Sequence, residues 1–132
     1  MSKISRRAFT GLAAASVGTL AFPSISLGAV PKVVVIGGGA GGATAARYIA
    51  KDSGGAVHVT LVEASKRYYT CFFSNIYLGG FRNYASIGHN YYGLAVNQGV
   101  NVVHEWAVSV DAVARKVKLG SGEHLSYDKL VI

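Results

Sequence analysis

The feature that most constrains this chain is a run of glycines directly after a short apolar segment. Residues 33–36 are all β-branched, as in a buried parallel strand, and the glycine-rich residues 37–42 follow without a gap. Residues 43–51 then show the alanine-rich pattern of a helix. A strand, a glycine turn and a helix in direct succession predict an α/β fold with a Rossmann-like βαβ unit and a parallel sheet.

A second strand is predicted at 57–62, and it ends at the acidic Glu63. This acid follows Gly42 by about 20 residues, the spacing at which a carboxylate meets the ribose of a bound dinucleotide. Gly37 allows the tight turn, Gly39 lets a pyrophosphate approach the backbone, and Gly42 lets the helix pack closely. The cofactor contacts expected from this fingerprint are Gly37, Gly39, Ala40, Gly41, Gly42 and Glu63.

The glutamate disfavours a 2′-phosphate, so a non-phosphorylated adenosine cofactor is expected. The fingerprint alone does not separate NAD from FAD. A glycine-rich loop without any ligand is the plain alternative. Further along, 99–105 is predicted as a third parallel strand, and 107–113, 115–119 and 123–132 as an antiparallel meander that turns at 120–122.

The first thirty residues predict an export signal. Arg6 and Arg7 precede an uncharged stretch whose apolar part spans 11–22, and small residues at 26–29 suit a signal peptidase. The apolar part is too short and too diluted for a spanning helix, which makes a membrane anchor the weaker alternative. The paired arginines are typical of a twin-arginine signal. We therefore expect a signal over 1–29, a nucleotide-binding domain over 30–132, and a periplasmic protein.

Composition excludes several classes of protein. The chain is 51% hydrophobic, which is too apolar for a disordered tail, and its single cysteine cannot form an internal disulfide. The net charge of +7 is scattered, three basic residues lie in the first seven positions, and no aromatic-basic motif indicates nucleic acid. The four histidines lack metal-ligand spacing, so no metal site is expected.

Cys71 lies eight positions after Glu63, and eight residues of fully extended chain span at most about 26 Å. It can therefore reach the flavin end of an extended FAD. The segment 68–75, Tyr-Tyr-Thr-Cys-Phe-Phe-Ser-Asn, together with the glycine turn, closely resembles the flavoprotein subunit of flavocytochrome c sulfide dehydrogenase. The likeness extends through 102–105 to the closing 127–132.

This resemblance implies FAD as the cofactor, bonded covalently through Cys71, with the backbone of Val103 beside the adenine. It further implies that sulfide is oxidised and that electrons pass through FAD to a haem-bearing cytochrome c subunit. The family's redox-active cysteine pair and its further domains have no counterpart here, so no catalytic residue is expected within this chain. We expect an N-terminal fragment that is inactive alone.

Two alternatives stay open. One is another FAD-dependent oxidoreductase of the same fold, linked to a quinone or to NADH, and the other is a truncated chain without activity. Without the resemblance, Cys71 is better interpreted as a buried structural cysteine. The aromatic residues around it are expected to pack in the core or loops, to shield the flavin, or to face a protein partner; they are Tyr68, Tyr69, Phe72, Phe73, Tyr77, Phe81, Tyr84, Tyr91 and Tyr92.

Overall fold

The computed structural model describes residues 28–132, so the predicted export signal lies outside the described residues except for its last two positions. The main body is built from β1 (Lys32–Ile36), α2 (Ala40–Asp52), β2 (His58–Val62), α4 (Tyr92–Gln98), β5 (Asn101–Val103) and β9 (Lys129–Val131). Between β2 and α4 lie β3 (Arg67–Tyr69), α3 (Ser74–Leu78), the 3-10 helix η1 (Tyr84–Ile87) and β4 (Gly88–Asn90). Between β5 and β9 lie β6 (Ala107–Asp111), β7 (Lys116–Leu119) and β8 (His124–Ser126).

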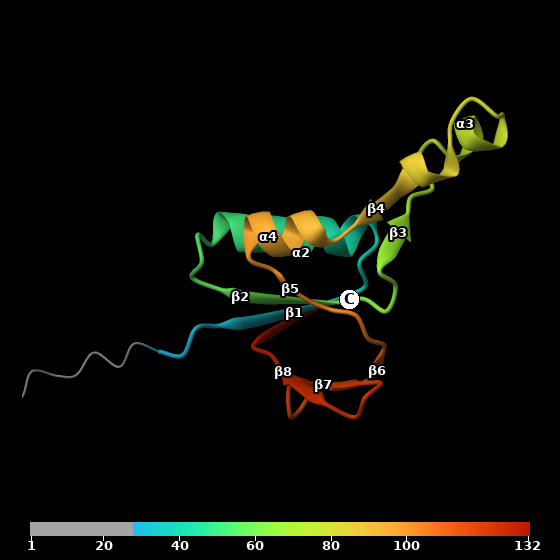
Figure 1. The fold of residues 1–132 in the computed structure, drawn as a ribbon. Coiled ribbons are helices and arrows are strands. Elements are labelled where there is room, and N and C mark those ends of the chain that lie inside the picture. Colours follow the sequence, from blue (N-terminus) through green and yellow to red (C-terminus); the bar gives the residue numbers. More distant parts are fainter. Residues whose placement is uncertain (1–27) are drawn as a thin grey trace, which may run out of the picture.

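The central sheet has four parallel strands in the order β5-β2-β1-β9. Helices α2 and α4 cover one face, and the antiparallel strands β6 to β8 cover the other (Figure 1). The predicted α/β class, with its parallel sheet and antiparallel meander, is confirmed, as is the third parallel strand. Helix α2 begins at Ala40, earlier than the predicted 43, because Gly41 and Gly42 form its first turn.

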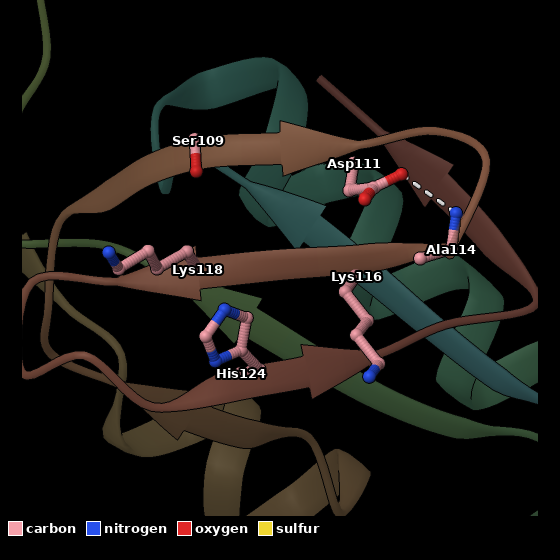
Figure 2. Close-up of a pocket in the computed structure, with 6 residues that line it drawn as sticks. All are labelled: Ser109, Asp111, Ala114, Lys116, Lys118 and His124. Atoms are coloured by element: carbon pink, nitrogen blue, oxygen red, sulfur yellow. Dashed lines mark hydrogen bonds between the residues drawn. The ribbon is translucent and has the colours of Figure 1, made fainter.

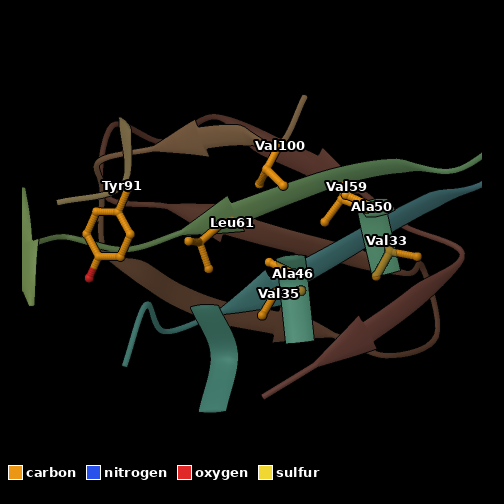
Figure 3. Close-up of a cluster of buried hydrophobic side chains, with 8 residues drawn as sticks. All are labelled: Val33, Val35, Ala46, Ala50, Val59, Leu61, Tyr91 and Val100. Atoms are coloured by element: carbon orange, nitrogen blue, oxygen red, sulfur yellow. The ribbon is translucent and has the colours of Figure 1, made fainter. Parts of the chain in front are cut away.

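Alternation along β1 divides the core into two layers. Val33 and Val35 point toward the helices, whereas Val34 points toward the meander, as the two-residue period of a strand requires. Figure 3 shows the helix-side cluster, in which Ala46 and Ala50 bring α2 close to the sheet. On the other face, Val34 and Val62 pack with Val117 and Leu119 of β7. Both faces of the strands are therefore buried, which explains their continuous apolar sequence.

The prediction that 123–132 belongs to the meander is wrong for its last part. Strand β9 leaves the meander after β8 and pairs in parallel with β1, where Val34 lies opposite Leu130. The Asp128 carboxylate accepts a hydrogen bond from the Lys32 N–H at 2.7 Å, and the Asp128 N–H donates to the Lys32 carbonyl at 2.8 Å. This reciprocal pair fixes the start of β9 beside the start of β1.

The segment 67–90 forms an arm that extends away from the sheet (Figure 1). Its base is the antiparallel pair β3–β4, in which Tyr68 lies opposite His89. Tyr69 and Tyr84 stack within the arm, with ring centroids 4.5 Å apart. Many of its large apolar side chains stay exposed, including Phe81 at 87%. Of the expected packing in core or loops, the structure shows Tyr91 in the core and Tyr69 stacked on Tyr84 in the arm, while most of the other aromatic side chains of the cluster are exposed.

Candidate functional site

The glycine turn between β1 and α2 is shaped by two steric demands. Gly37 has φ of +94°, a conformation that residues with a side chain rarely adopt. A Cβ on Gly42 would collide with the carbonyl oxygen of Gly37. The Gly37 N–H donates to the Val62 carbonyl at 2.9 Å, which keeps the turn against the end of β2. These two glycines are needed by the fold itself.

Gly39, Ala40 and Gly41 surround the N-terminus of α2 and are only partly covered. A Cβ on Gly41 would meet no atom within 4 Å, and one on Gly39 would meet only the Tyr68 ring edge at 3.8 Å. No acidic residue lies in the first turn, and the N-cap, Gly39, has no side chain to occupy the free N–H groups. The helix end is therefore open to an anion, which its dipole favours.

Glu63 is half-buried at the end of β2, and its carboxylate faces the glycine turn. One carboxylate oxygen accepts the Gly38 N–H at 2.7 Å, and the other accepts the Ser65 N–H at 2.8 Å. An ionised carboxylate offers about four acceptor sites, so two remain for hydroxyl groups of a ligand. The observed contacts are compatible with the predicted role at a ribose.

Val103 ends β5 beside Glu63. Its carbonyl accepts the Glu63 N–H at 2.9 Å, while the Nδ1 atom of the next residue, His104, lies 3.1 Å from the Glu63 carbonyl oxygen. The structure thus gathers the predicted glycine turn, Glu63 and Val103 at the carboxyl ends of three adjacent parallel strands. In open α/β sheets this edge is where ligands bind.

Two residues of this edge were missed from sequence. Gly38 is buried, and its carbonyl accepts a hydrogen bond from the Tyr91 hydroxyl at 2.9 Å. Burial, followed by the negative charge of Glu63, raises the pKa of Tyr91 to about 12, so the hydroxyl stays a donor. The only available signal was Gly38 itself, a glycine at a position where the fingerprint tolerates any residue.

A hollow of about 190 Å³ opens beside Gly38, between the first turns of α2, the base of the arm and α4. Its polar and aromatic lining includes Thr44, Arg47, Tyr68, His89, Asn90 and Tyr91. The hollow connects the glycine turn to the arm that carries Cys71. It gives an extended ligand a second surface next to the helix end.

Cys71 lies apart from the other predicted contacts, in the arm just after β3. The residue is exposed, so the alternative of a buried structural cysteine is wrong. The Thr70 hydroxyl accepts the Phe72 N–H at 3.1 Å and shapes the backbone around the cysteine. A hollow of about 250 Å³ next to it is lined by Thr70, Phe72, Phe73, Arg82, Ser86, Ile87 and His89.

A separate hollow of about 440 Å³ lies on the outer face of the meander (Figure 2). Lys116, Lys118 and His124 surround it, and the Asp111 carboxylate accepts the Ala114 N–H at 2.7 Å. None of the predicted cofactor residues lines it, and its side chains are exposed to water. We therefore place the candidate site at the glycine turn.

Within residues 28–132, no three His, Cys, Asp or Glu side chains are grouped so as to hold a metal ion. In the same range no helix has the length and hydropathy needed to cross a membrane.

Comparison with known proteins identifies relatives. Residues 31–132 match the family model described as pyridine nucleotide-disulphide oxidoreductase. The flavoprotein chain of sulfide dehydrogenase (flavocytochrome c) from Chlorobaculum thiosulfatiphilum is 50% identical over 44 residues, which are 33% of this chain and 90% of that sequence. This relative is a flavoprotein chain of the type that the sequence resembles, and the match covers a third of this chain.

Among solved structures, the sulfide:quinone oxidoreductase of Aquifex aeolicus is 28% identical, with a TM-score of 0.67 over 76% of this chain. An NAD-dependent persulfide reductase of A. fulgidus is 29% identical, with a TM-score of 0.63 over 75%. This chain covers only 23% and 20% of those two proteins. The similarity therefore concerns one part of each larger enzyme.

Proposed function

This chain belongs to the pyridine nucleotide-disulphide oxidoreductase family, and on that premise we propose that it is the FAD-binding part of a sulfide dehydrogenase of the flavocytochrome c type. One observation supports FAD binding: the glycine turn, Glu63 and Val103 lie close together at one edge of the sheet. The sulfide part of the proposal rests on the 50% identical stretch of a sulfide dehydrogenase flavoprotein chain.

Family membership and the flavoprotein relative imply FAD as the cofactor. The residues present fit it, because a side chain is excluded at Gly42 while the backbone at Gly39 and Gly41 stays accessible. When bound, FAD supplies a two-electron acceptor that can pass its electrons on singly. The chain's own contribution is to bind, orient and retain it.

We assign the parts of FAD to these residues as follows. The N-terminus of α2, with Gly39, Ala40, Gly41 and Gly42, holds the diphosphate through backbone N–H groups. Gly37, whose own N–H donates to the Val62 carbonyl, contributes the tight turn that places this helix end. Glu63 accepts hydrogen bonds from the adenosine ribose through its two remaining acceptor sites. The backbone at Val103 borders the adenine, because β5 ends next to Glu63.

We further propose that Cys71 forms a thioether between its Sγ and the 8α-methyl carbon of FAD. This bond would replace the thiol S–H and one methyl C–H, and the electron pair released would reduce the flavin, which the electron acceptor of the enzyme would then reoxidise. Its exposure supports this assignment, since the thiol can be reached, and the adjacent hollow of about 250 Å³ offers an aromatic wall for a ring system. A covalent bond prevents loss of the cofactor outside the cytoplasm.

The remaining proposals concern the whole enzyme. Electrons would leave to a cytochrome c haem subunit, and the protein would work in the periplasm after twin-arginine export of the folded, loaded chain. The signal over 1–29 and the domain over 30–132 stay predictions. The catalytic cysteines of the family have no counterpart in this chain, whose only cysteine is Cys71.

A quinone-linked or persulfide-linked oxidoreductase is the second candidate. The structural similarity to a sulfide:quinone oxidoreductase and to a persulfide reductase, at 28% and 29% identity, favours it. The two candidates differ in the electron acceptor and in how the flavin is held. A covalent flavin at Cys71 favours the flavocytochrome c type.

The test is to produce the 132-residue chain in cells that make FAD and to denature the purified protein with acid. We expect the yellow chromophore to stay with the polypeptide, and a tryptic peptide containing Cys71 to carry the flavin mass. Cys71→Ser should release its flavin under the same treatment, whereas Ser74→Ala, a matched control nearby, should retain it. Flavin released intact from wild type would refute covalent attachment, and absence of flavin would refute FAD binding.

A further inference from the structure

The glycine turn has a peptide unit whose orientation is fixed from outside the turn. The Tyr91 hydroxyl donates to the Gly38 carbonyl at 2.9 Å from a position 53 residues further along the chain. Tyr91 is only 5% exposed and belongs to the helix-side core, where its ring lies 5.8 Å from that of His104. The Tyr91 hydroxyl is therefore held in place by core packing that includes strand residues as well as α2, and this packing lies outside the glycine turn.

Peptide geometry transmits this contact to the next residue. The bond between Gly38 and Gly39 is trans, since the described residues contain no cis peptide. In a planar trans peptide the C=O and N–H groups point in opposite directions. Drawing the Gly38 carbonyl inward to Tyr91 thus turns the Gly39 N–H outward, toward the open end of α2.

The outward N–H is free to meet a ligand. Within the part of the chain that the structure describes, the Gly39 N–H has no protein acceptor, while the Gly39 carbonyl accepts the Ala43 N–H at 2.9 Å. The space outside is open, because a Cβ on Gly39 would meet only Tyr68. A donor aimed into open space next to a helix N-terminus suits a phosphate oxygen.

Steric fit supports the same arrangement. A Cβ on Gly38 would lie 2.5 Å from the Tyr91 hydroxyl oxygen and 2.7 Å from two ring carbons. Glu63 holds the other side of the same residue by accepting the Gly38 N–H at 2.7 Å. Gly38 is thus held between a carboxylate and a phenol, which leaves its backbone little freedom.

We propose that Tyr91 is a positioning residue for the cofactor diphosphate: by binding the Gly38 carbonyl, it orients the Gly39 N–H toward a phosphate oxygen. This inference rests on the proposed binding of an adenine dinucleotide at the glycine turn. Tyr91 then acts on phosphate binding, through the Gly39 N–H, whereas Glu63 binds the ribose.

The experiment compares ADP with adenosine as probes of the 132-residue chain, by calorimetric titration. Every protein in the comparison, the one called wild type included, carries Cys71→Ser and is freed of flavin by acid treatment and refolding, so that the site is open to the probe. Tyr91→Phe removes the donor and keeps the ring, and we expect ADP to bind about fivefold more weakly, as for loss of one hydrogen bond. Adenosine, which has no phosphate, should bind this variant as well as wild type. Tyr92→Phe is the matched control, since Tyr92 is the exposed neighbour in sequence and should leave both affinities unchanged.

The outcomes separate this inference from the function on which it rests. Equal ADP affinities of wild type and Tyr91→Phe would overturn the role of Tyr91 while leaving dinucleotide binding intact. An equal loss for adenosine would assign Tyr91 to general support of the fold. Failure of wild type to bind ADP would overturn both proposals.

A second measurement needs only this flavin-free wild-type reference and so does not depend on the folding of a Tyr91 variant. We expect ADP to shift the amide resonance of Gly39 strongly downfield, as a new hydrogen bond to phosphate does, and adenosine to leave it in place. The Gly122 amide, in the turn before β8, is the internal reference. Equal movement of the Gly39 signal with both probes would refute the proposal.

Discussion

Glu63 accepts a hydrogen bond from the Gly38 N–H across 2.7 Å and so joins the end of β2 to the turn that follows β1. The same carboxylate also accepts the Ser65 N–H, so one side chain organises both turns at this edge of the sheet. Glu63, the predicted ribose contact, therefore also stabilises the fold, so its substitution should change both stability and nucleoside affinity.

Replacing Glu63 with glutamine should lower both stability and nucleoside affinity. The neutral amide keeps one acceptor oxygen but loses the charge-assisted bonds, so we expect the free energy of unfolding to fall by about 1–2 kcal/mol. Urea denaturation measures the stability and titration with adenosine the affinity. Glu123→Gln, on the exposed meander, is the control, and equal stability of both variants would contradict the supporting role.

Two neighbouring glycines should respond in opposite ways to the same added methyl group. Gly42→Ala is expected to destabilise the fold by at least about 2 kcal/mol, because the new Cβ collides with the Gly37 carbonyl. Gly41→Ala meets open space and should raise stability by up to about 1 kcal/mol, since alanine favours a helix. Thermal unfolding followed by circular dichroism compares the pair. Similar melting temperatures would show that the close approach of α2 is not required.

The buried phenol of Tyr91 should make stability sensitive to high pH. Its pKa is raised to about 12 by burial and by the charge of Glu63, whereas an unfolded tyrosine titrates near 10. Between those values the unfolded chain releases a proton that the folded chain retains, so the contribution is complete below pH 10 and lost as the pH rises to 12.

We therefore expect the stability difference between wild type and Tyr91→Phe to shift against wild type by up to about 3 kcal/mol between pH 10 and 12. Guanidinium titrations at several pH values give this difference, in which the other tyrosines and the lysines cancel. Tyr92→Phe should show no such change relative to wild type. A pH-independent difference would mean that the Tyr91 hydroxyl titrates in the folded chain as it does in the unfolded one.

Removal of the Asp128 side chain should loosen the edge of the sheet. Asp128→Ala deletes the acceptor for the Lys32 N–H, and we expect a loss of about 1–2 kcal/mol together with faster hydrogen exchange of the β9 amides. Asp52→Ala is the comparison, since removing a negative charge at the C-terminal end of α2 should be neutral or mildly stabilising. Unchanged exchange in β9 would show that strand pairing alone fixes this edge.

The sequence predicted those parts of the fold whose signals are local. The run Val33 to Ile36, the glycine turn and Glu63 each have a spacing that follows from backbone geometry, and all lie where expected. The third strand was recognisable as a short apolar segment, whereas helix α4 in front of it was not predicted. The gathering of these elements at one edge follows from parallel pairing.

What could not be predicted depends on contacts between distant positions. Strand β9 looks like a continuation of the meander, because a short apolar segment after a turn does not reveal which sheet it joins. Only the pairing with β1 and the Asp128–Lys32 contact decide this. Tyr91 was likewise one aromatic among nine in its region, and nothing local indicates that its hydroxyl meets Gly38.

The pairing of β1 with β9 also determines when the sheet can be completed. Lys32 and Asp128 are 96 positions apart, so a ribosome that adds about 5–20 residues per second makes the two partners about 5–20 s apart. Throughout that interval one edge of β1 lacks its neighbour, whereas β2 becomes available on the other side well before β9 is made. A chaperone that recognises extended apolar segments has this window in which to prevent the nascent chain from pairing with another copy.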